Sequence, residues 1–170
     1  MALANHVVLI IGATGEIGKS IAFNTAEEGA SILLADADSA RGTELLTQFE
    51  NAGHSAAFVE CDPSSEESIQ AAVGETVLSF GNLTSVVYCS GAAPTGSASS
   101  IDPEAWTKSV VPSLRGFAAA ARFALPLLVG CCRGEGVVSG DFVGQVARDV
   151  GEVASRDEVG EGFPSDPAGG

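Results

Sequence analysis

Near its start the chain has glycines at the spacing of a phosphate-binding turn. The segment Gly12-Ala13-Thr14-Gly15-Glu16-Ile17-Gly18 follows an apolar run and precedes a helical pattern. Glycine allows a tight turn and lets a pyrophosphate approach the backbone, while the first turn of the next helix offers unpaired N–H donors and a positive dipole end. The spacing also occurs in ordinary glycine-rich turns, but its place between a strand and a helix predicts a nucleotide-binding turn.

An aspartate at the end of the next apolar run supports this prediction. Asp36 stands where a carboxylate accepts hydrogen bonds from the hydroxyls of an adenosine ribose, and its charge repels a 2′-phosphate. The pattern therefore favours NAD over NADP as the cofactor. Three alternatives stay open: Asp36 is only a turn residue, Asp38 is the acceptor instead, or Arg41 binds a phosphate through its guanidinium.

These residues need alternating strands and helices to position them, and the apolar pattern predicts both. The predicted strands are His6–Ile11, Ser31–Ala35, Ala56–Cys61, Ser85–Cys89 and a weaker Val137–Ser139. The predicted helices are Glu16–Glu28, Ser39 (as N-cap) to about Asn51, Ser65 to Phe80, and about Asp102 to Leu128, with a kink or break expected at Pro112. The fold class is α/β: a doubly wound, Rossmann-like parallel sheet of about five strands in the order 3-2-1-4-5.

The composition indicates one folded domain. The chain has 170 residues, of which 45% are hydrophobic, and a chain of about this length buries roughly two thirds of its surface on folding. We expect residues 1–144 to form a dinucleotide-binding domain. We expect residues 145–170, which are acidic and rich in glycine and proline, to form a disordered tail.

The charge and the apolar runs exclude several classes of partner. The formal net charge is −14, so nucleic acid and anionic membranes would repel the chain. The longest apolar stretch, Phe117–Cys132, contains Arg122 and Pro126 and is shorter than the roughly 20 residues of a membrane span. The run Val7–Ile11 is too short for a signal peptide. We therefore expect a cytoplasmic protein that binds neither membrane nor nucleic acid.

The four cysteines do not have the spacing of a metal site. Without a secretory signal they are expected to be reduced thiols, and neither histidine lies near them in the sequence, so no metal is expected. The adjacent Cys131 and Cys132 are expected to be small apolar residues, with a strained vicinal disulfide as the alternative.

Several of these motifs together resemble the short-chain dehydrogenase/reductase family. They are Gly12–Gly18, Asp36, Cys61-Asp62 after the third predicted strand and Cys89-Ser90-Gly91 after the fourth, and the resemblance covers residues 5–144. It implies an NAD(P)-dependent oxidoreductase acting on a small molecule. It also implies that Asp62 binds the adenine amino group, that its successor packs on the ring, and that Gly91 lets the cofactor lie against the fourth strand.

The resemblance is incomplete in its binding motifs. The family's Asn-Asn-Ala-Gly motif falls on Tyr88-Cys89-Ser90-Gly91 and keeps only the glycine. Gly15 and Glu16 stand where typical members have a non-glycine followed by a glycine, which is closer to the extended or atypical members. Trp106 and Gly116 match the family's fourth long helix.

The resemblance breaks down at the catalytic residues. The family's general acid is a tyrosine four residues before a lysine, whereas this chain has one tyrosine, Tyr88, and no lysine after Lys108. The helix asparagine of the catalytic tetrad falls on Ser113. The catalytic serine falls on Asp141, or on Ser139 in a shifted register. Ser113 and Asp141 are weak candidates for a replacement, since a carboxyl is a poor proton donor at neutral pH unless burial raises its pKa.

Two functions remain open at this point. One is an oxidoreductase whose missing acid comes from elsewhere. The other is a non-catalytic dinucleotide-binding pseudoenzyme, or a truncated gene product, that associates with a full-length relative. The far sheet edge and the apolar face of the predicted helix from Trp106 to Leu128 are expected to be uncovered, and in the family this helix forms part of the dimer interface. We therefore expect a homo-oligomer or a complex with a related full-length protein.

Overall fold

The computed structural model describes residues 2–91, 102–131 and 138–139. Its strands are β1 (Val7–Ile11), β2 (Ser31–Asp36), β3 (Ala56–Glu60), β4 (Ser85–Tyr88) and β5 (Val138–Ser139). Its helices are α1 (Glu16–Glu27), α2 (Ser39–Asn51), α3 (Glu66–Phe80) and α4 (Pro103–Cys131). The predicted tail 145–170, Asp141 and Cys132 lie outside the described residues.

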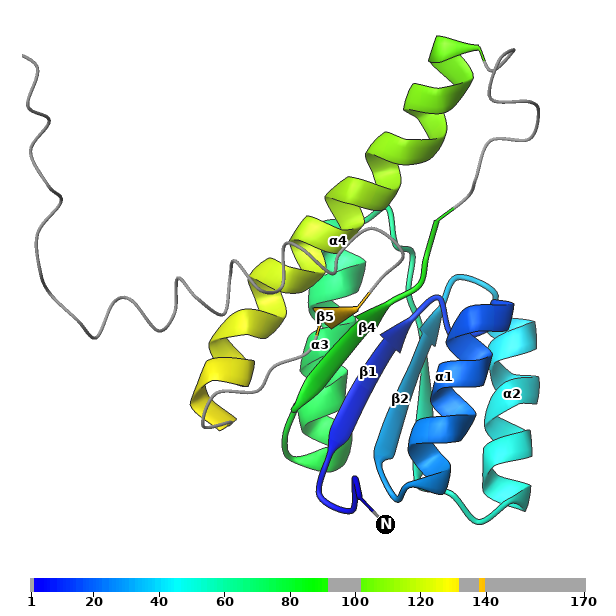
Figure 1. Ribbon diagram of the computed structural model, residues 1–170, viewed down its shortest axis with the longest axis vertical. Coiled ribbons are helices and arrows are strands. Elements are labelled where there is room, and N and C mark those ends of the chain that lie inside the picture. Colours follow the sequence, from blue (N-terminus) through cyan, green and yellow to red (C-terminus); the bar gives the residue numbers. More distant parts are fainter. Residues whose placement is uncertain (1, 92–101, 132–137, 140–170) are drawn as a thin grey trace, which may run out of the picture.

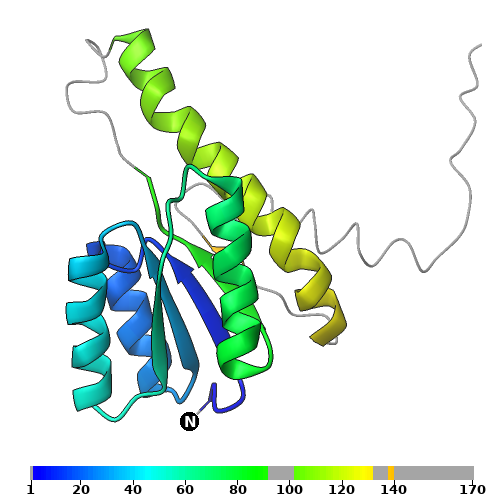
Figure 2. The same ribbon diagram turned by 180° about the vertical axis from the view of Figure 1, so that it is seen from behind.

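All strand pairs are parallel, and the sheet has the order β3-β2-β1-β4-β5. The predicted doubly wound topology is therefore confirmed. Helices α1 and α2 cover one face of the sheet and α3 and α4 cover the other (Figures 1 and 2). Right-handed crossovers between parallel strands produce this arrangement from alternating strands and helices.

The core has two layers because strand side chains alternate between the faces of the sheet. Leu9 and Ile11 of β1 pack in the layer of α3 and α4, whereas Val8 and Ile10 pack in the layer of α1 and α2. All five residues of β1 are buried. A strand with helices on both sides needs apolar residues at every position, which explains its continuous apolar sequence.

Helix α3 has close to its predicted bounds, but the cap of α2 differs from the prediction. Ser65 Oγ accepts a hydrogen bond from the Ser68 N–H at 3.2 Å, and Gly81 ends α3 with φ +79°. The N-cap of α2 is Asp38, whose Oδ1 accepts from the Arg41 N–H at 3.0 Å, so the prediction of Ser39 as N-cap is wrong by one residue. Asp and Ser are about equally good N-caps, so composition did not distinguish them.

Helix α4 runs unbroken through Pro112 and Pro126, so of the two outcomes predicted at Pro112 the break is wrong, and the kink stays a prediction. Pro112 is exposed, and water can therefore solvate the carbonyl that its missing N–H leaves unpaired. The N-terminal half of α4 extends beyond the sheet, and its C-terminal half packs on α3 (Figures 1 and 2). No helix within the described ranges is both long and apolar enough to cross a bilayer.

Candidate cofactor-binding site

The predicted site residues gather at the carboxyl edge of the sheet. Because the strands are parallel, the segments that follow β1, β2, β3 and β4 all emerge at that edge. The turn Gly12–Gly18 follows β1, Asp36 ends β2, Asp62 follows β3, and Cys89–Gly91 follows β4. The chain direction of successive crossovers reverses between β1 and β4, which is where ligands bind in open α/β sheets.

Two glycines of the turn are required by packing. Gly12 has φ +86°, and a Cβ added to it would lie 2.7 Å from the backbone nitrogen of Ser90. A Cβ on Gly18 would overlap the carbonyl oxygen of Gly12. These two positions hold the turn against the end of β4 and against the start of α1, so any side chain there would displace backbone.

Gly15 is different, because nothing in the fold requires glycine there. Its φ of −69° and ψ of 158° suit any residue, it is exposed, and a Cβ would meet no atom nearer than the Gly12 carbonyl oxygen at 3.5 Å. Gly15 is the N-cap of α1, and Lys19 N–H donates back to its carbonyl at 2.8 Å. The N–H groups of the residues between them have no helical carbonyl one turn earlier. A group with oxygen acceptors would fit the open space over this turn.

Asp36 holds the turn from the side of β2. Its Oδ2 accepts from the Thr14 N–H at 2.9 Å, and its Oδ1 accepts from the Asp38 N–H at 3.2 Å. A carboxylate has about four acceptor positions, so two stay open for ribose hydroxyls. The Arg41 guanidinium donates through Nη2 to the Thr14 carbonyl at 3.2 Å. Asp38 is used as the α2 cap, which weakens it as the alternative ribose acceptor.

Asp62 is exposed on the loop after β3. Its Oδ1 accepts from the Ser64 hydroxyl at 2.7 Å and from the Ser64 N–H at 2.8 Å, and these two hydrogen bonds lower the pKa of the carboxyl. The neighbouring Cys61 is buried, and burial raises the pKa of its thiol. At neutral pH the loop therefore presents one carboxylate and an uncharged, inaccessible thiol.

Tyr88 is buried at the end of β4 beneath α4. Its hydroxyl and the Pro63 carbonyl fill the space that a Cβ on Gly116 would need, so Gly116 allows α4 to approach the sheet. Burial raises the pKa of Tyr88 to about 12, although a hydrogen bond with the Ser90 side chain partly opposes the shift. A phenol with this pKa is a poor proton donor near neutral pH.

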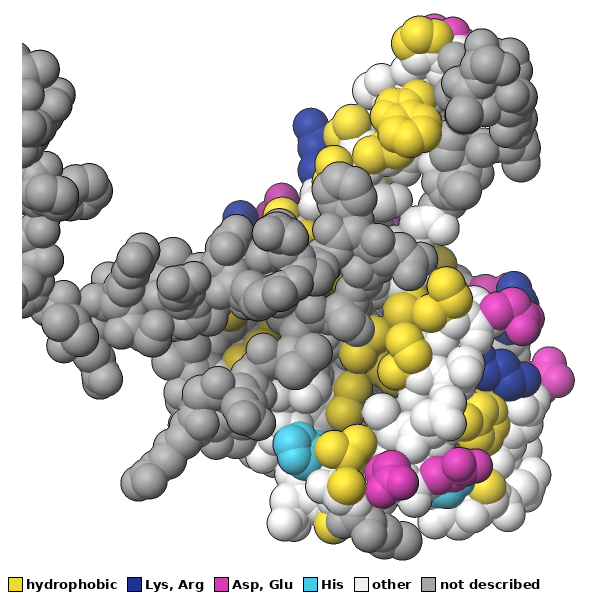
Figure 3. Space-filling view, viewed as in Figure 1, with side chains coloured by type: hydrophobic (Ala, Val, Ile, Leu, Met, Phe, Trp, Pro, Cys, Tyr) yellow, Lys and Arg dark blue, Asp and Glu magenta, His cyan; other side chains and the backbone are white. Residues whose placement is uncertain are grey.

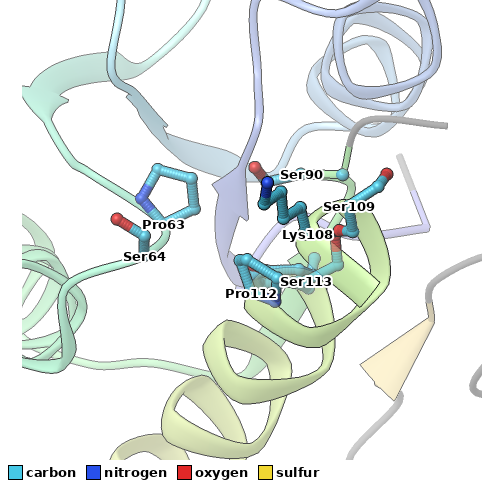
Figure 4. A pocket seen from close by; sticks show the side chains of 9 residues that line it. Pro63, Ser64, Ser90, Lys108, Ser109, Pro112 and Ser113 are labelled. Atoms are coloured by element: carbon cyan, nitrogen blue, oxygen red, sulfur yellow. The ribbon is translucent and has the colours of Figure 1, made fainter. Parts of the chain in front are cut away.

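A pocket of about 360 Å³ lies between the loop after β3, the end of β4 and the first half of α4 (Figure 4). This volume falls within the range of small-molecule sites. Figure 4 shows Lys108, Ser109, Pro112 and Ser113 of α4 on one side of the pocket, with Pro63 and Ser64 on the other. The lining residues are Pro63, Ser64, Tyr88, Ser90, Gly91, Lys108, Ser109, Pro112 and Ser113.

Ser113, predicted as a weak catalytic candidate, lies at this pocket. Its Oγ donates to the Ser109 carbonyl at 3.1 Å, and it would be 3.1 Å from a Cβ on Gly91. Lys108, Ser109 and Pro112 were not predicted to line a site, although their spacing from Ser113 places all four residues on one side of a helix. The Lys108 ammonium is exposed and pairs with Glu104 at 2.8 Å.

Asp141, the other catalytic candidate, lies outside the described residues. Glu16 and Ile17 are exposed at the start of α1, and Cys89 and Ser90 are half-buried between the turn and the pocket. The structure thus brings the predicted binding residues together at one edge. Their roles in binding stay a prediction.

The chain matches the family model described as short chain dehydrogenase over residues 6–147. It is 31% identical over 126 residues to the cis-4-hydroxycyclohexanecarboxylate dehydrogenase of Sinomonas cyclohexanicum, an alignment that covers 73% of this chain and 50% of that enzyme. It is also similar in structure to a short chain dehydrogenase from Mycobacterium smegmatis, with a TM-score of 0.73, 28% identity, and 82% of this chain and 58% of that chain covered.

A short chain dehydrogenase/reductase from Burkholderia phymatum in complex with NAD has the same fold, with a TM-score of 0.72 at 21% identity. That superposition covers 82% of this chain and 50% of the other chain. The chain spans between about a third and about half of the length of the curated relatives it matches.

Proposed function

The chain belongs to the short-chain dehydrogenase family, and on that premise we propose that it binds a nicotinamide dinucleotide, NAD(H) in preference to NADP(H). The cofactor would lie along the carboxyl edge of the sheet. The observation that carries the proposal is Gly15, an exposed glycine that the fold does not require, at the start of a helix with unpaired N–H groups. Backbone that is open in this way suits the close approach of a pyrophosphate.

The preference for NAD(H) is proposed from Asp36. Its carboxylate lies beside the turn and keeps acceptor positions for the ribose hydroxyls. A 2′-phosphate at the same place would meet the charge of Asp36 and that of Asp38 two residues further on.

The adenine end of the cofactor would reach the loop after β3, where Asp62 would accept from the adenine amino group and Pro63 would pack on the ring. Pro63 lines the pocket. Two hydrogen bonds from Ser64 to the Asp62 Oδ1 orient the carboxylate, so the loop would present both residues to the adenine. When bound, the cofactor supplies or accepts a hydride. The residues of this chain would bind it, orient it and disfavour 2′-phosphorylated forms.

Catalysis by the family's route is not proposed for this chain acting alone. Its one tyrosine is buried under α4 with a pKa of about 12, and no lysine follows Lys108. A non-catalytic dinucleotide-binding protein is therefore the second candidate function, and the buried position of Tyr88 is the observation that favours it.

We further propose that the chain associates through α4, either with itself or with a related full-length protein. Hydrophobic side chains are exposed along the part of α4 that extends from the body, as Figure 3 shows. Trp106 is 50% exposed and Leu114 45% exposed. Large apolar side chains exposed along one element are typical of an interface.

Titration with NADH and with NADPH, followed by cofactor fluorescence, tests the binding proposal. We expect saturable binding of both, with NADH bound more tightly. If neither cofactor binds saturably, the proposed site is wrong. If NADH and NADPH bind with equal affinity, the role proposed for Asp36 is wrong.

A further inference from the structure

We propose that Arg41 is a positioning residue that holds the glycine-rich turn in shape for the pyrophosphate, rather than a receptor for a 2′-phosphate. This inference rests on the proposed binding of a dinucleotide at the turn. It concerns a residue of α2 that lies outside the turn itself.

Arg41 is placed by the N-terminus of α2. Asp38 caps that helix by accepting from the Arg41 N–H at 3.0 Å, so the backbone of Arg41 is fixed in the first turn. Helices α1 and α2 begin at the same end of the sheet (Figure 1). From there the Arg41 side chain crosses to the turn, where Nη2 donates to the Thr14 carbonyl at 3.2 Å.

Thr14 is therefore held on both sides by charged groups. Its N–H donates to the Asp36 carboxylate at 2.9 Å, and its carbonyl accepts from the Arg41 guanidinium. Thr14 is itself buried. Hydrogen bonds that involve an ionised partner are stronger than neutral ones, so this pair resists rotation of the peptide groups on either side of Thr14.

The fixed carbonyl also sets the direction of the next N–H. The peptide between Thr14 and Gly15 is planar and trans, so its C=O and N–H point in opposite directions. With the carbonyl held toward α2, its negative end is kept away from the open side of the turn, and the Gly15 N–H faces away from α2. That N–H makes only a long contact of 3.4 Å with the Gly12 carbonyl, which leaves it able to bind a stronger acceptor.

A role as a 2′-phosphate receptor fits the surroundings of Arg41 less well. A phosphate on its guanidinium would lie beside the carboxylates of Asp36 and Asp38, and like charges at such short range repel. The two roles also predict different selectivity. A positioning role affects NADH and NADPH equally, because both carry the same pyrophosphate, whereas a receptor role affects NADPH alone.

The test measures the dissociation constants of NADH and NADPH for the parent chain and for Arg41→Ala, Arg41→Lys and Arg115→Ala. Arg115 is exposed on α4, and its replacement changes the net charge by the same amount. We expect Arg41→Ala to weaken both cofactors by about tenfold, the value of a hydrogen bond to a charged group, and to leave their ratio within about twofold of the parent's. Arg41→Lys should recover part of the loss, since an ammonium still donates, and Arg115→Ala should bind as the parent does.

Competition against NADH separates positioning from general damage to the fold. ADP, which carries the pyrophosphate, should lose affinity in Arg41→Ala, whereas adenosine should compete as well as it does against the parent. A loss confined to NADPH, equal losses for ADP and adenosine, or no loss at all would each overturn the role proposed for Arg41. If the parent binds neither cofactor, the proposed function itself fails, an outcome distinct from these.

Discussion

Replacing Gly15 by valine should separate binding from folding in this protein. The added Cβ has room within the fold, since its nearest neighbour would be the Gly12 carbonyl oxygen at 3.5 Å. The extended backbone at Gly15, with φ −69° and ψ 158°, is one that β-branched residues readily adopt. The branched side chain would instead occupy the open side of the turn, where we propose that the pyrophosphate approaches.

The expected size of the effect follows from the groups that the valine would cover. If two N–H donors at the start of α1 lose a charged acceptor, each loss costs about 1.5–3 kcal/mol. Together they amount to roughly 3 kcal/mol or more, which weakens NADH binding by at least about 100-fold. Stability should change little. The freedom that the unfolded chain loses with the glycine favours the folded state by about 0.4–1 kcal/mol, whereas valine is a poorer N-cap than glycine and costs a similar amount at the start of α1.

Gly74→Val is the matched control. Gly74 is an exposed glycine of α3 with nothing within 4 Å of an added Cβ. Both variants should be compared with the parent by NADH fluorescence titration and by urea unfolding. Gly74→Val should bind NADH as the parent does. If Gly15→Val binds NADH with the parent's affinity, the turn is not a phosphate cradle. If it is destabilised by more than about 2 kcal/mol, which exceeds the loss of an N-cap, the packing argument for Gly15 is wrong.

Three of the remaining predictions concern the cofactor site, and the fourth concerns the exposed part of α4. Asp36→Asn keeps a side-chain oxygen but removes the charge, so the ratio of NADPH to NADH dissociation constants should fall by about tenfold, and an unchanged ratio would count against Asp36 as the selective residue. Glu16→Gln removes an exposed negative charge from the start of α1, so NADH should bind a few-fold more tightly at low salt. This gain in affinity should shrink in about 0.5 M salt, which screens charges; an equal gain at both salt concentrations would exclude an electrostatic cause. The purified chain should not turn over ketones or alcohols with NAD(H) between pH 7 and 9, because the buried Tyr88, with a pKa of about 12, is too weak an acid to donate a proton readily and has almost no phenolate to accept one; turnover above background would contradict this. Light scattering at a protein concentration of tens of micromolar should show species larger than a monomer. Leu114→Glu, on the exposed part of α4, should reduce the mass of these species, and a monodisperse parent monomer would refute association through α4.

The parts of this fold that the sequence predicted correctly depend on local signals. Helix α3 begins after Ser65 and ends at Gly81 because a hydroxyl cap and a left-handed glycine act within a few residues. The strand order followed from apolar runs joined by helices, since right-handed crossovers leave few alternatives. The cap of α2 was misplaced by one residue because Asp38 and Ser39 are both good N-caps, and the choice depends on backbone geometry.

The parts that the sequence did not predict depend on contacts between distant segments. Arg41 reaches Thr14 across 27 positions of the chain, and nothing in the sequence near either residue signals that contact. The lining of the pocket by Lys108 and Ser109 depends on how α4 crosses the end of β4. That crossing in turn depends on Gly116 fitting over the hydroxyl of Tyr88, a packing relation that only the folded structure reveals.

The proposed dinucleotide site rests on contacts among residues that the structure describes. The contacts that shape the turn come from strands β2 and β4 and from helix α2. Gly12 packs against Ser90 after β4, and Thr14 is hydrogen-bonded to Asp36 of β2 and to Arg41 of α2. Each joins residues that the structure describes, so the proposed phosphate cradle does not require any segment after α4. None of the residues in these contacts is a proton donor with a pKa of about 7. The nearest phenol, that of Tyr88, is buried and has a pKa of about 12. The geometry of the turn therefore argues for a protein that holds a dinucleotide, whether or not a partner supplies the acid that hydride transfer would need.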